Sequence, residues 1–332
     1  MSRSDSRTAC SLSNHHNMRV AVIGAGAVGG YFGGMLARAG ALVTLIGRSR
    51  HVDVWRRNGL LLESPNFQGT IPVQASTEFD AARDADLVLF TVKAIDTEDA
   101  ARQLARHLRT GALVISLQNG VGNVPAMRAA AALDPVAAVV YVASSTPAPG
   151  IVKHDGRGDL LIGDLPGRRG ARRDAELTRI SGWFEAAGVP CRVSTDIEAD
   201  LWAKLITNAA LNAISAVVHV TYGEAAASPD CRDVIRLLVD ECVAVARASR
   251  VALPAVDYGQ RVWDFAERIG FAYASTSQDL ERGKRTEIDA LNGFIVRRGL
   301  ELGVSTPVNR TLLALVKLRE RQFECAASDP RE

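Results

Sequence analysis

Arg19-Val-Ala-Val-Ile-Gly-Ala-Gly-Ala-Val-Gly29 sets the architecture of the first half of this chain of 332 residues. Val20 to Ile23 form a short apolar run of the kind found in strands buried on both faces of a sheet. The segment after the glycines predicts a helix up to about Ala39, ended by Gly40. Glycines at this spacing between a strand and a helix let the backbone approach a pyrophosphate at the helix N-terminus. We therefore expect a dinucleotide-binding turn formed by Gly24, Ala25, Gly26, Ala27, Val28 and Gly29.

The end of the next strand indicates which dinucleotide binds. Residues 41–46 form a second apolar run, which is followed by Gly47 and Arg48. An NAD-specific domain usually keeps an acidic residue at this place for the ribose 2′-hydroxyl, whereas an arginine neutralises a 2′-phosphate. Arg48 therefore favours NADPH over NADH. The alternative is an ordinary surface arginine.

Two further buried runs, residues 86–93 and 112–117, are each followed by polar side chains. Lys93 stands at the carboxyl end of the first run, and Asn119 follows the second. Open parallel sheets bind ligands at this edge, so we expect both residues near the cofactor or substrate, with the Asn119 amide bridging the two. The alternatives are a solvated strand end for Lys93 and a turn position in an Asn-Gly pair for Asn119.

The pattern then changes from strands to helices. Residues 136–142 predict another strand, and residues 151–154 and 160–163 predict two short strands around a glycine-rich turn, with His154 at a strand end and not a base. From about Asp196 the apolar period becomes 3.6 and stays helical, with breaks at Pro229, Pro254 and Pro307. We expect an α/β fold in which an N-terminal Rossmann-type doubly wound parallel sheet is followed by an all-α C-terminal domain. The expected divisions are a disordered tail at 1–17, an NADP-binding domain at 18–195, a helical substrate and catalytic domain at 196–326 and a tail at 327–332.

Composition excludes several classes of partner. The net charge is +2, and no basic run with interleaved aromatics would track nucleic acid. No apolar run approaches the length of a membrane helix, and the first 17 residues lack the apolar core of a secretory signal. The cysteines form no Cys-x-x-Cys pair, so we expect no metal site, no disulfide framework and a cytoplasmic location.

Met18 directly precedes the first strand, so translation from Met18 would give a complete fold. We expect a monomer or homodimer.

Polar residues recur every fourth position in the apolar segment 200–220. Lys204, Asn208 and Asn212 therefore lie along one stripe of a helix. Burying an ammonium and two amides costs several kcal/mol unless each finds a partner. The stripe either lines a polar cleft or makes an interhelical contact whose polar groups are satisfied within the protein. Spacing alone does not decide between these two interpretations.

Glu287 and Ser275 are the other candidate polar groups of the helical half. On one straight helix the separation of 12 positions would place their side chains about 120° apart. They converge only if the segment breaks, and Gly283 is the expected break. Spacing alone favours a solvated helix carboxylate for Glu287.

Together these motifs resemble the ketopantoate reductases (2-dehydropantoate 2-reductases). The resemblance extends from Met18 to about Glu324. It rests on the glycine turn, Lys93, Gln118-Asn-Gly120, Leu201-Trp-x-Lys204-x-x-x-Asn208-x-x-x-Asn212 and Arg285-Thr-Glu287-Ile-Asp-x-Leu-Asn-Gly293. The resemblance implies NADPH-dependent reduction of 2-dehydropantoate to pantoate, on the route to pantothenate and coenzyme A.

The resemblance also implies roles for single residues. Lys204 corresponds to the proton donor, and Glu287 to a residue that contacts the cofactor and supports the site. Lys93 and Asn119 correspond to positions at the junction of cofactor and substrate. The positions that hold substrate correspond to Asn208, Asn212 and Ser275.

One position departs from the family pattern. Better-known members carry an Asn-Gly pair after the Lys204 helix whose Asn also binds substrate, and here the matching pair is Tyr222-Gly223. The tyrosine hydroxyl could replace that amide, or the pocket could accept a different 2-oxo acid. Two alternatives therefore stand beside the main hypothesis: a paralogous NADPH-dependent reductase of another 2-oxo acid, and a non-enzymatic redox sensor that binds NADPH.

Overall fold

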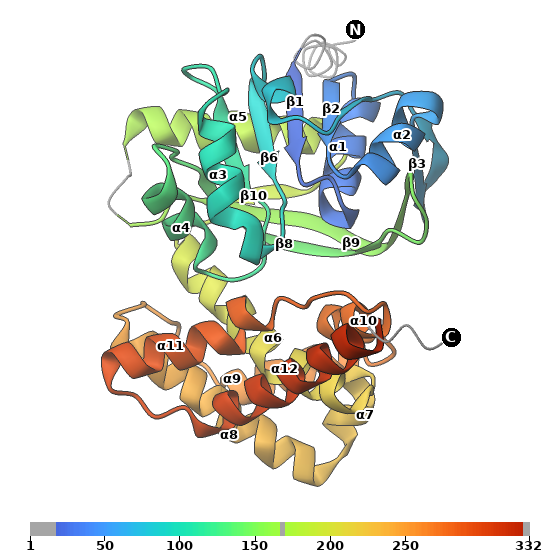
Figure 1. Cartoon of the computed structure of the whole chain (residues 1–332). Helices are drawn as coiled ribbons and strands as arrows, with labels where there is room; N and C mark the ends of the chain where they lie inside the picture. Colours follow the sequence, from blue (N-terminus) through green and yellow to red (C-terminus); the bar gives the residue numbers. More distant parts are fainter. Residues whose placement is uncertain (1–17, 167–169, 328–332) are drawn as a thin grey trace, which may run out of the picture. The chain divides into compact units, whose positions relative to one another are not determined.

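The structure, a computed structural model, describes residues 18–166 and 170–327. The tail expected at residues 1–17 and residues 328–332 of the expected C-terminal tail lie outside the described residues. The chain divides into two compact units (Figure 1). The first comprises the described residues up to Asn119 together with Asn123–Ile197, and the second comprises Gly120–Gly122 and the described residues from Glu198 onward.

Within the described residues, the first unit is built on one sheet of ten strands. The strands are β1 (Arg19–Ile23), β2 (Leu42–Ile46), β3 (Leu60–Ser64), β4 (Phe67–Ile71), β5 (Gln74–Ser76), β6 (Leu87–Phe90), β7 (Leu113–Ser116), β8 (Val136–Ser145), β9 (Ile151–Gly163) and β10 (Cys191–Val193). Their order is β4-β3-β9-β8-β7-β6-β1-β2-β5, with β10 beside β9. Strands β5, β2, β1, β6, β7 and β8 pair in parallel, which confirms the expected Rossmann-type sheet. Antiparallel pairs of β8 with β9 and of β3 with β4 extend it into a mixed sheet.

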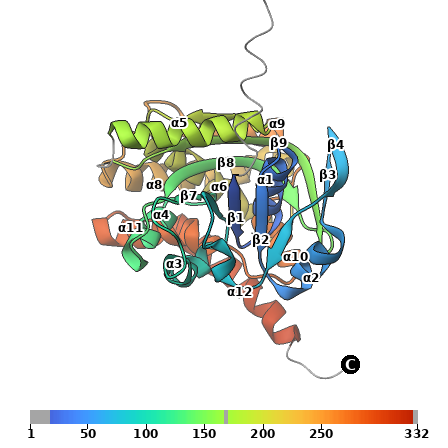
Figure 2. The same ribbon diagram turned by 90° about the horizontal axis from the view of Figure 1, so that it is seen from above.

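Helices cover both faces of this sheet. They are α1 (Ala27–Arg38), α2 (Ser49–Asn58), α3 (Thr97–Ala105), α4 (Asn123–Ala130) and α5 (Ala171–Ala186), with short 3-10 turns η2 (Phe79–Ala82) and η3 (Ala94–Asp96). Successive β1 residues supply different cores because side chains alternate across a strand. Val20 and Val22 pack with α1 and α5, whereas Ala21 and Ile23 pack with α3 and α4. Figure 2 shows α1 and α3 on opposite sides of β1.

Glycines let α1 lie close to several strands at once. A Cβ on Gly30 would lie 2.6 Å from Val152 of β9, and one on Gly34 would lie 2.9 Å from Leu60 of β3. Each glycine weakens a helix by about 1 kcal/mol relative to alanine. Here the loss is offset by burial of α1 against both the parallel and the mixed part of the sheet.

Residues 151–163 differ from the expectation of two short strands around a turn. They form the single strand β9, which pairs antiparallel with β8. Two register shifts in this pairing absorb the irregular residues as bulges, so no turn forms. His154 therefore lies inside β9 and not at a strand end. It is buried, stacks on Tyr31 with ring centroids 4.1 Å apart, and its Nδ1 lies 2.9 Å from Ser64 Oγ.

The second unit is helical in all its regular elements among the described residues. These are α6 (Ile197–Val218), α7 (Tyr222–Ala227), α8 (Pro229–Ala248), α9 (Tyr258–Arg268), α10 (Ser275–Glu281), η4 (Ile288–Ala290), α11 (Asn292–Leu302) and α12 (Pro307–Ala327). The predicted breaks are confirmed, because α8 begins at Pro229, α12 begins at Pro307, and Pro254 lies between α8 and α9. One core, which includes Leu205, joins these helices.

The expectation that no apolar segment approaches the length of a membrane helix is wrong for α6. Its 22 residues are long and apolar enough to cross a membrane by length and composition. Of its most apolar window, 67% is buried within the protein, as in the central helix of a helical core. This burial explains the composition of α6 by packing.

Candidate active site

The turn after β1 has the geometry of a phosphate-binding loop. Gly24 has a φ of +79°, and the N–H groups of Gly24 and Ala25 donate to the Ile46 carbonyl of β2 at 3.0 and 2.9 Å. Gly26 is the N-cap of α1, and no side chain of the described residues caps this helix. A Cβ on Gly26 would meet only the Gly24 carbonyl oxygen, at 3.8 Å. The first N–H groups of α1 are therefore left for an anionic ligand approaching over Gly26.

Gly29 meets a different need. A Cβ at this position would overlap Thr91 Oγ1 and would lie 2.6 Å from Val22 Cγ1. Thr91 Oγ1 itself donates to the carbonyls of Ile23, at 2.9 Å, and Gly24, at 3.1 Å. Gly29 thus permits close packing of α1 on β1, whereas Gly26 leaves space for the ligand.

Three parallel strands bring the predicted cofactor residues of the first unit to one edge. β1 pairs with β2 on one side and with β6 on the other, so the glycine turn lies where the crossovers diverge. Lys93 follows β6 as the N-cap of η3, and Asn119 follows β7. Both side chains are partly exposed at the carboxyl ends of their strands. This is the edge at which open parallel sheets bind ligands.

A buried polar network, not anticipated from the sequence, holds the two loops that carry Lys93 and Asn119. Gln118 Nε2 donates to the backbone carbonyl before Lys93 at 3.0 Å and to Thr97 Oγ1 at 2.7 Å. Thr97 Oγ1 donates to Asn123 Oδ1 at 3.2 Å, and Asn123 Nδ2 donates to the Asn119 carbonyl at 2.7 Å. The sequence signal that could have indicated this network is Gln118, because it directly follows a buried strand and a buried glutamine requires hydrogen-bond partners.

Arg48 lies at the same edge as the glycine turn. It follows β2, the parallel neighbour of β1, and is the N-cap of α2. Its side chain is exposed, as is that of Arg50 in the first turn of α2. An exposed guanidinium beside a dinucleotide loop can pair with a phosphate. Its preference for a 2′-phosphate stays a prediction.

The polar stripe of α6 is divided between solvent-accessible and buried members. Lys204 and Asn208 are partly exposed, whereas Asn212 is only 3% exposed. Tyr222 of α7, 8% exposed, donates its hydroxyl proton to Asn212 Oδ1 at 3.0 Å. The oxygen of Asn212 at the buried end of the stripe therefore makes an interhelical contact, whereas Lys204 and Asn208 at the other end are partly accessible to solvent.

Ser275 and Glu287 belong to the same helical unit as the stripe. Ser275 is exposed at the start of α10, and the N–H before it, on Ala274, donates to Ser215 Oγ of α6 at 3.3 Å. α10 ends before Gly283, which has a φ of +60°, so the predicted break is confirmed. Glu287 is partly exposed and precedes η4, so it is not the carboxylate of a regular solvated helix.

A buried carboxylate fixes the segment that carries Glu287. The N–H and the hydroxyl of Thr286 both donate to Glu320 Oε1, at 2.8 and 2.6 Å, and Glu320 is 9% exposed on α12. Lys317 Nζ lies 3.5 Å from Glu320 Oε2. Sequence reasoning missed Glu320, because a single acidic residue in a charged helix carries no distinguishing pattern.

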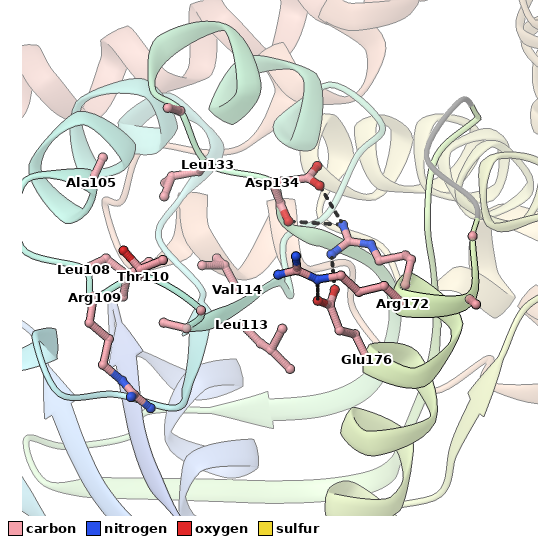
Figure 3. A pocket seen from close by; sticks show the side chains of 16 residues that line it. Ala105, Leu108, Arg109, Thr110, Leu113, Val114, Leu133, Asp134, Arg172 and Glu176 are labelled. Carbon is pink, nitrogen blue, oxygen red and sulfur yellow. Dashed lines mark hydrogen bonds and ion pairs between the residues drawn. The ribbon is translucent and has the colours of Figure 1, made fainter.

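A cavity of about 770 Å³ in the first unit lies elsewhere (Figure 3). It is lined by residues at the amino end of β7, such as Leu113, and so lies at the edge opposite the glycine turn. Three of its charged groups pair with one another: Glu176 contacts Arg172 at 3.2 Å and Arg173 at 3.0 Å. Figure 3 shows Arg172 and Glu176 turned toward each other. Neither its place nor its charges suit it to the dinucleotide. The described residues contain no group of three or more His, Cys, Asp or Glu that could hold a metal.

Comparison with known proteins identifies the family. Residues 20–167 match the family model for ketopantoate reductase PanE/ApbA, and residues 196–320 match the model for its C-terminal domain. The chain is 35% identical over 310 residues to the 2-dehydropantoate 2-reductase of Halobacterium salinarum, covering 92% of this chain and 99% of that protein. The chain belongs to the ketopantoate reductase family.

Solved structures agree with this membership. A PanE/ApbA family ketopantoate reductase from Ralstonia eutropha has a TM-score of 0.86 and 46% sequence identity, covering 92% of this chain and 100% of that one. A D-mandelate dehydrogenase in complex with NADH has a TM-score of 0.82 and 25% identity, covering 92% of this chain and 100% of that one. Like other ketopantoate reductases, this chain is an oxidoreductase that uses a nicotinamide dinucleotide and a small keto acid.

Proposed function

We propose that this ketopantoate reductase reduces 2-dehydropantoate to pantoate with NADPH, a step toward pantothenate and coenzyme A. The observation that carries the proposal is the match to the 2-dehydropantoate 2-reductase of Halobacterium salinarum over 99% of its length, with the Lys204 stripe intact. A redox sensor has no need of an ammonium and two amides in register on one helix. The reductase is therefore favoured over the non-enzymatic alternative.

The chain's own groups suit this chemistry. NADPH, when bound, supplies a hydride for the 2-oxo carbon of the substrate. The carbonyl oxygen takes up the resulting negative charge, and the Lys204 ammonium stabilises it and donates the proton that completes the hydroxyl group. Asn208, Asn212 and Ser275 then hold the substrate, since amide and hydroxyl groups can donate to its carboxylate and carbonyl oxygens.

The cofactor assignments rest on the first unit. The uncapped N-terminus of α1 and the open space over Gly26 suit the pyrophosphate. Arg48 would pair with the 2′-phosphate, which is why we propose NADPH over NADH. Lys93 and Asn119 would contact the nicotinamide end and the substrate. Glu287 would support the cofactor from the helical unit.

Location and assembly follow as further parts of the proposal. Among the described residues Cys191, Cys231 and Cys242 are all free thiols, which suits a reducing cytoplasm. The small net charge of +2 gives no reason to expect nucleic acid as a partner, and we expect no membrane. The protein would act as a monomer or homodimer.

The test is the loss of NADPH absorbance with 2-dehydropantoate, with NADH and other 2-oxo acids measured alongside. Lys204→Ala should lower kcat by about 100-fold or more, the usual contribution of a positioned proton donor, while NADPH binding is retained. The matched control is Lys153→Ala, which removes an exposed lysine paired with Asp155 at 3.0 Å. Full turnover in Lys204→Ala would remove Lys204 from the mechanism, and no turnover of 2-dehydropantoate by the wild type would refute the substrate.

A further inference from the structure

Tyr222 stands where the resemblance leads one to expect a substrate-binding asparagine, yet its hydroxyl is already engaged. It donates to Asn212 Oδ1 at 3.0 Å, and both residues are buried, at 8% and 3% exposure. A phenol has one proton to donate. The only proton that the Tyr222 hydroxyl can donate is therefore used in the hydrogen bond to Asn212, so Tyr222 has none left to donate to a substrate.

This contact determines which side of the Asn212 amide can meet a ligand. An amide has one acceptor oxygen and an NH₂ group with two donor protons. Because Oδ1 accepts from Tyr222, the NH₂ group is turned away from that residue. A 2-oxo acid offers carboxylate and carbonyl oxygens, which accept hydrogen bonds. The orientation held by Tyr222 therefore presents to such a substrate the donors that it requires.

Backbone contacts hold Tyr222 firmly enough for this role. It begins α7 directly after Thr221, whose side chain forms a capping box with Glu224. The Tyr222 N–H donates to the Ala272 carbonyl at 3.0 Å, in the segment that leads into Ser275. Burial raises the pKa of Tyr222 well above its usual value, so the phenol remains a donor at every physiological pH. Tyr222 thus connects α6, α7 and the segment before α10 within one unit.

We propose that Tyr222 is a positioning residue that orients the Asn212 amide with its donor side toward the 2-oxo acid. In place of a second asparagine that binds substrate directly, this chain has a tyrosine that orients Asn212. The inference rests on the proposed function, because it assigns Asn212 to the substrate of that same site.

A double-mutant cycle tests the proposal in the full-length protein. Tyr222→Phe removes only the hydroxyl and should raise KM for 2-dehydropantoate about 3- to 10-fold, the range of one hydrogen bond, with kcat nearly unchanged. In the Asn212→Ala background the same change should have no further effect on KM, because the group that it orients is gone. NADPH affinity, measured by fluorescence titration, should be equal in all four proteins. Tyr258→Phe, at another buried tyrosine of the same unit, is the matched control and should leave KM unchanged.

The possible outcomes separate the inference from the function on which it rests. Additive effects on KM, or an unchanged KM in Tyr222→Phe, would overturn the positioning role while leaving the reductase assignment intact. If Tyr222→Phe lowered the melting temperature and weakened NADPH binding as much as substrate binding, Tyr222 would only stabilise the fold. A wild-type protein that reduces a different 2-oxo acid overturns the named substrate, and the cycle is then measured with that acid. One that reduces none overturns both proposals.

Discussion

Two glycines of the same turn should respond to alanine in opposite ways. Gly26 has a φ of −100°, which other residues adopt, and an added Cβ would meet only the Gly24 carbonyl oxygen at 3.8 Å. At Gly29 an added Cβ would overlap Thr91 Oγ1 and lie 2.6 Å from Val22 Cγ1. We expect Gly26→Ala to leave the fold stable and weaken the dinucleotide, and Gly29→Ala to destabilise the fold itself.

The size of the second effect follows from three contributions. Forcing a methyl group into this packed contact costs about 1–3 kcal/mol, because Val22 is buried in β1 and cannot move aside. Rotating Thr91 away gives up its hydrogen bonds to Ile23 and Gly24, worth about 1 kcal/mol. The higher helix propensity of alanine relative to glycine stabilises α1 by about 1 kcal/mol. The net loss is about 1–3 kcal/mol, or about 2–12 °C in melting temperature for a unit of this size.

Thermal unfolding and NADPH titration of the same variants check both halves of this reasoning. Gly182→Ala, inside α5 with nothing within 4 Å of the added Cβ, is the control and should stabilise slightly. Gly26→Ala should melt within about 2 °C of the wild type while its NADPH affinity falls at least about 10-fold, since a methyl group blocks the approach of the pyrophosphate. A Gly29→Ala protein as stable as the wild type, or a Gly26→Ala protein with unchanged NADPH affinity, would refute the division of roles.

Two further outcomes test the cofactor preference and the thiols. Arg48→Ala should lower the preference for NADPH over NADH by about 10-fold or more, because a charge-assisted contact to the 2′-phosphate is lost. The control is Arg57→Ala, at an exposed arginine in the last turn of α2. An equal change of cofactor preference in both variants would contradict a specific role for Arg48. Burial raises the pKa of the Cys191 and Cys242 thiols to about 12, so at pH 8 the reactive thiolate is about 1000-fold scarcer than for a thiol of pKa 9.0. Peptide mass spectrometry after alkylation should show both cysteines modified only after denaturation, and rapid labelling of Cys242 in the native protein would contradict its burial.

Features that depend on neighbours in the sequence could be predicted. The strand, glycine turn and helix at Arg19–Arg38 are specified by contiguous residues, and the period of 3.6 in α6 is a property of that segment alone. The breaks at Pro229 and Gly283 are local as well. The mixed part of the sheet could not be predicted in the same way, because β9 is one strand only through its antiparallel pairing with β8. The apolar composition of α6 likewise could not be assigned to a buried core helix from the sequence alone, because the helices that bury it lie elsewhere in the sequence.

The α6 stripe shows where sequence reasoning about a site reaches its limit. A spacing of four residues establishes that Lys204, Asn208 and Asn212 share a face, but it cannot reveal what that face meets. The partner of Asn212 is Tyr222, ten residues away on another helix, and the pair forms only when α7 packs beside α6. The structure thus shows the interhelical contact for Asn212, whereas the polar cleft stays a prediction for the partly exposed Lys204 and Asn208. At the buried end only the Asn212 oxygen is engaged, by Tyr222, and in the proposed role this contact turns the donor side of the same amide toward the substrate.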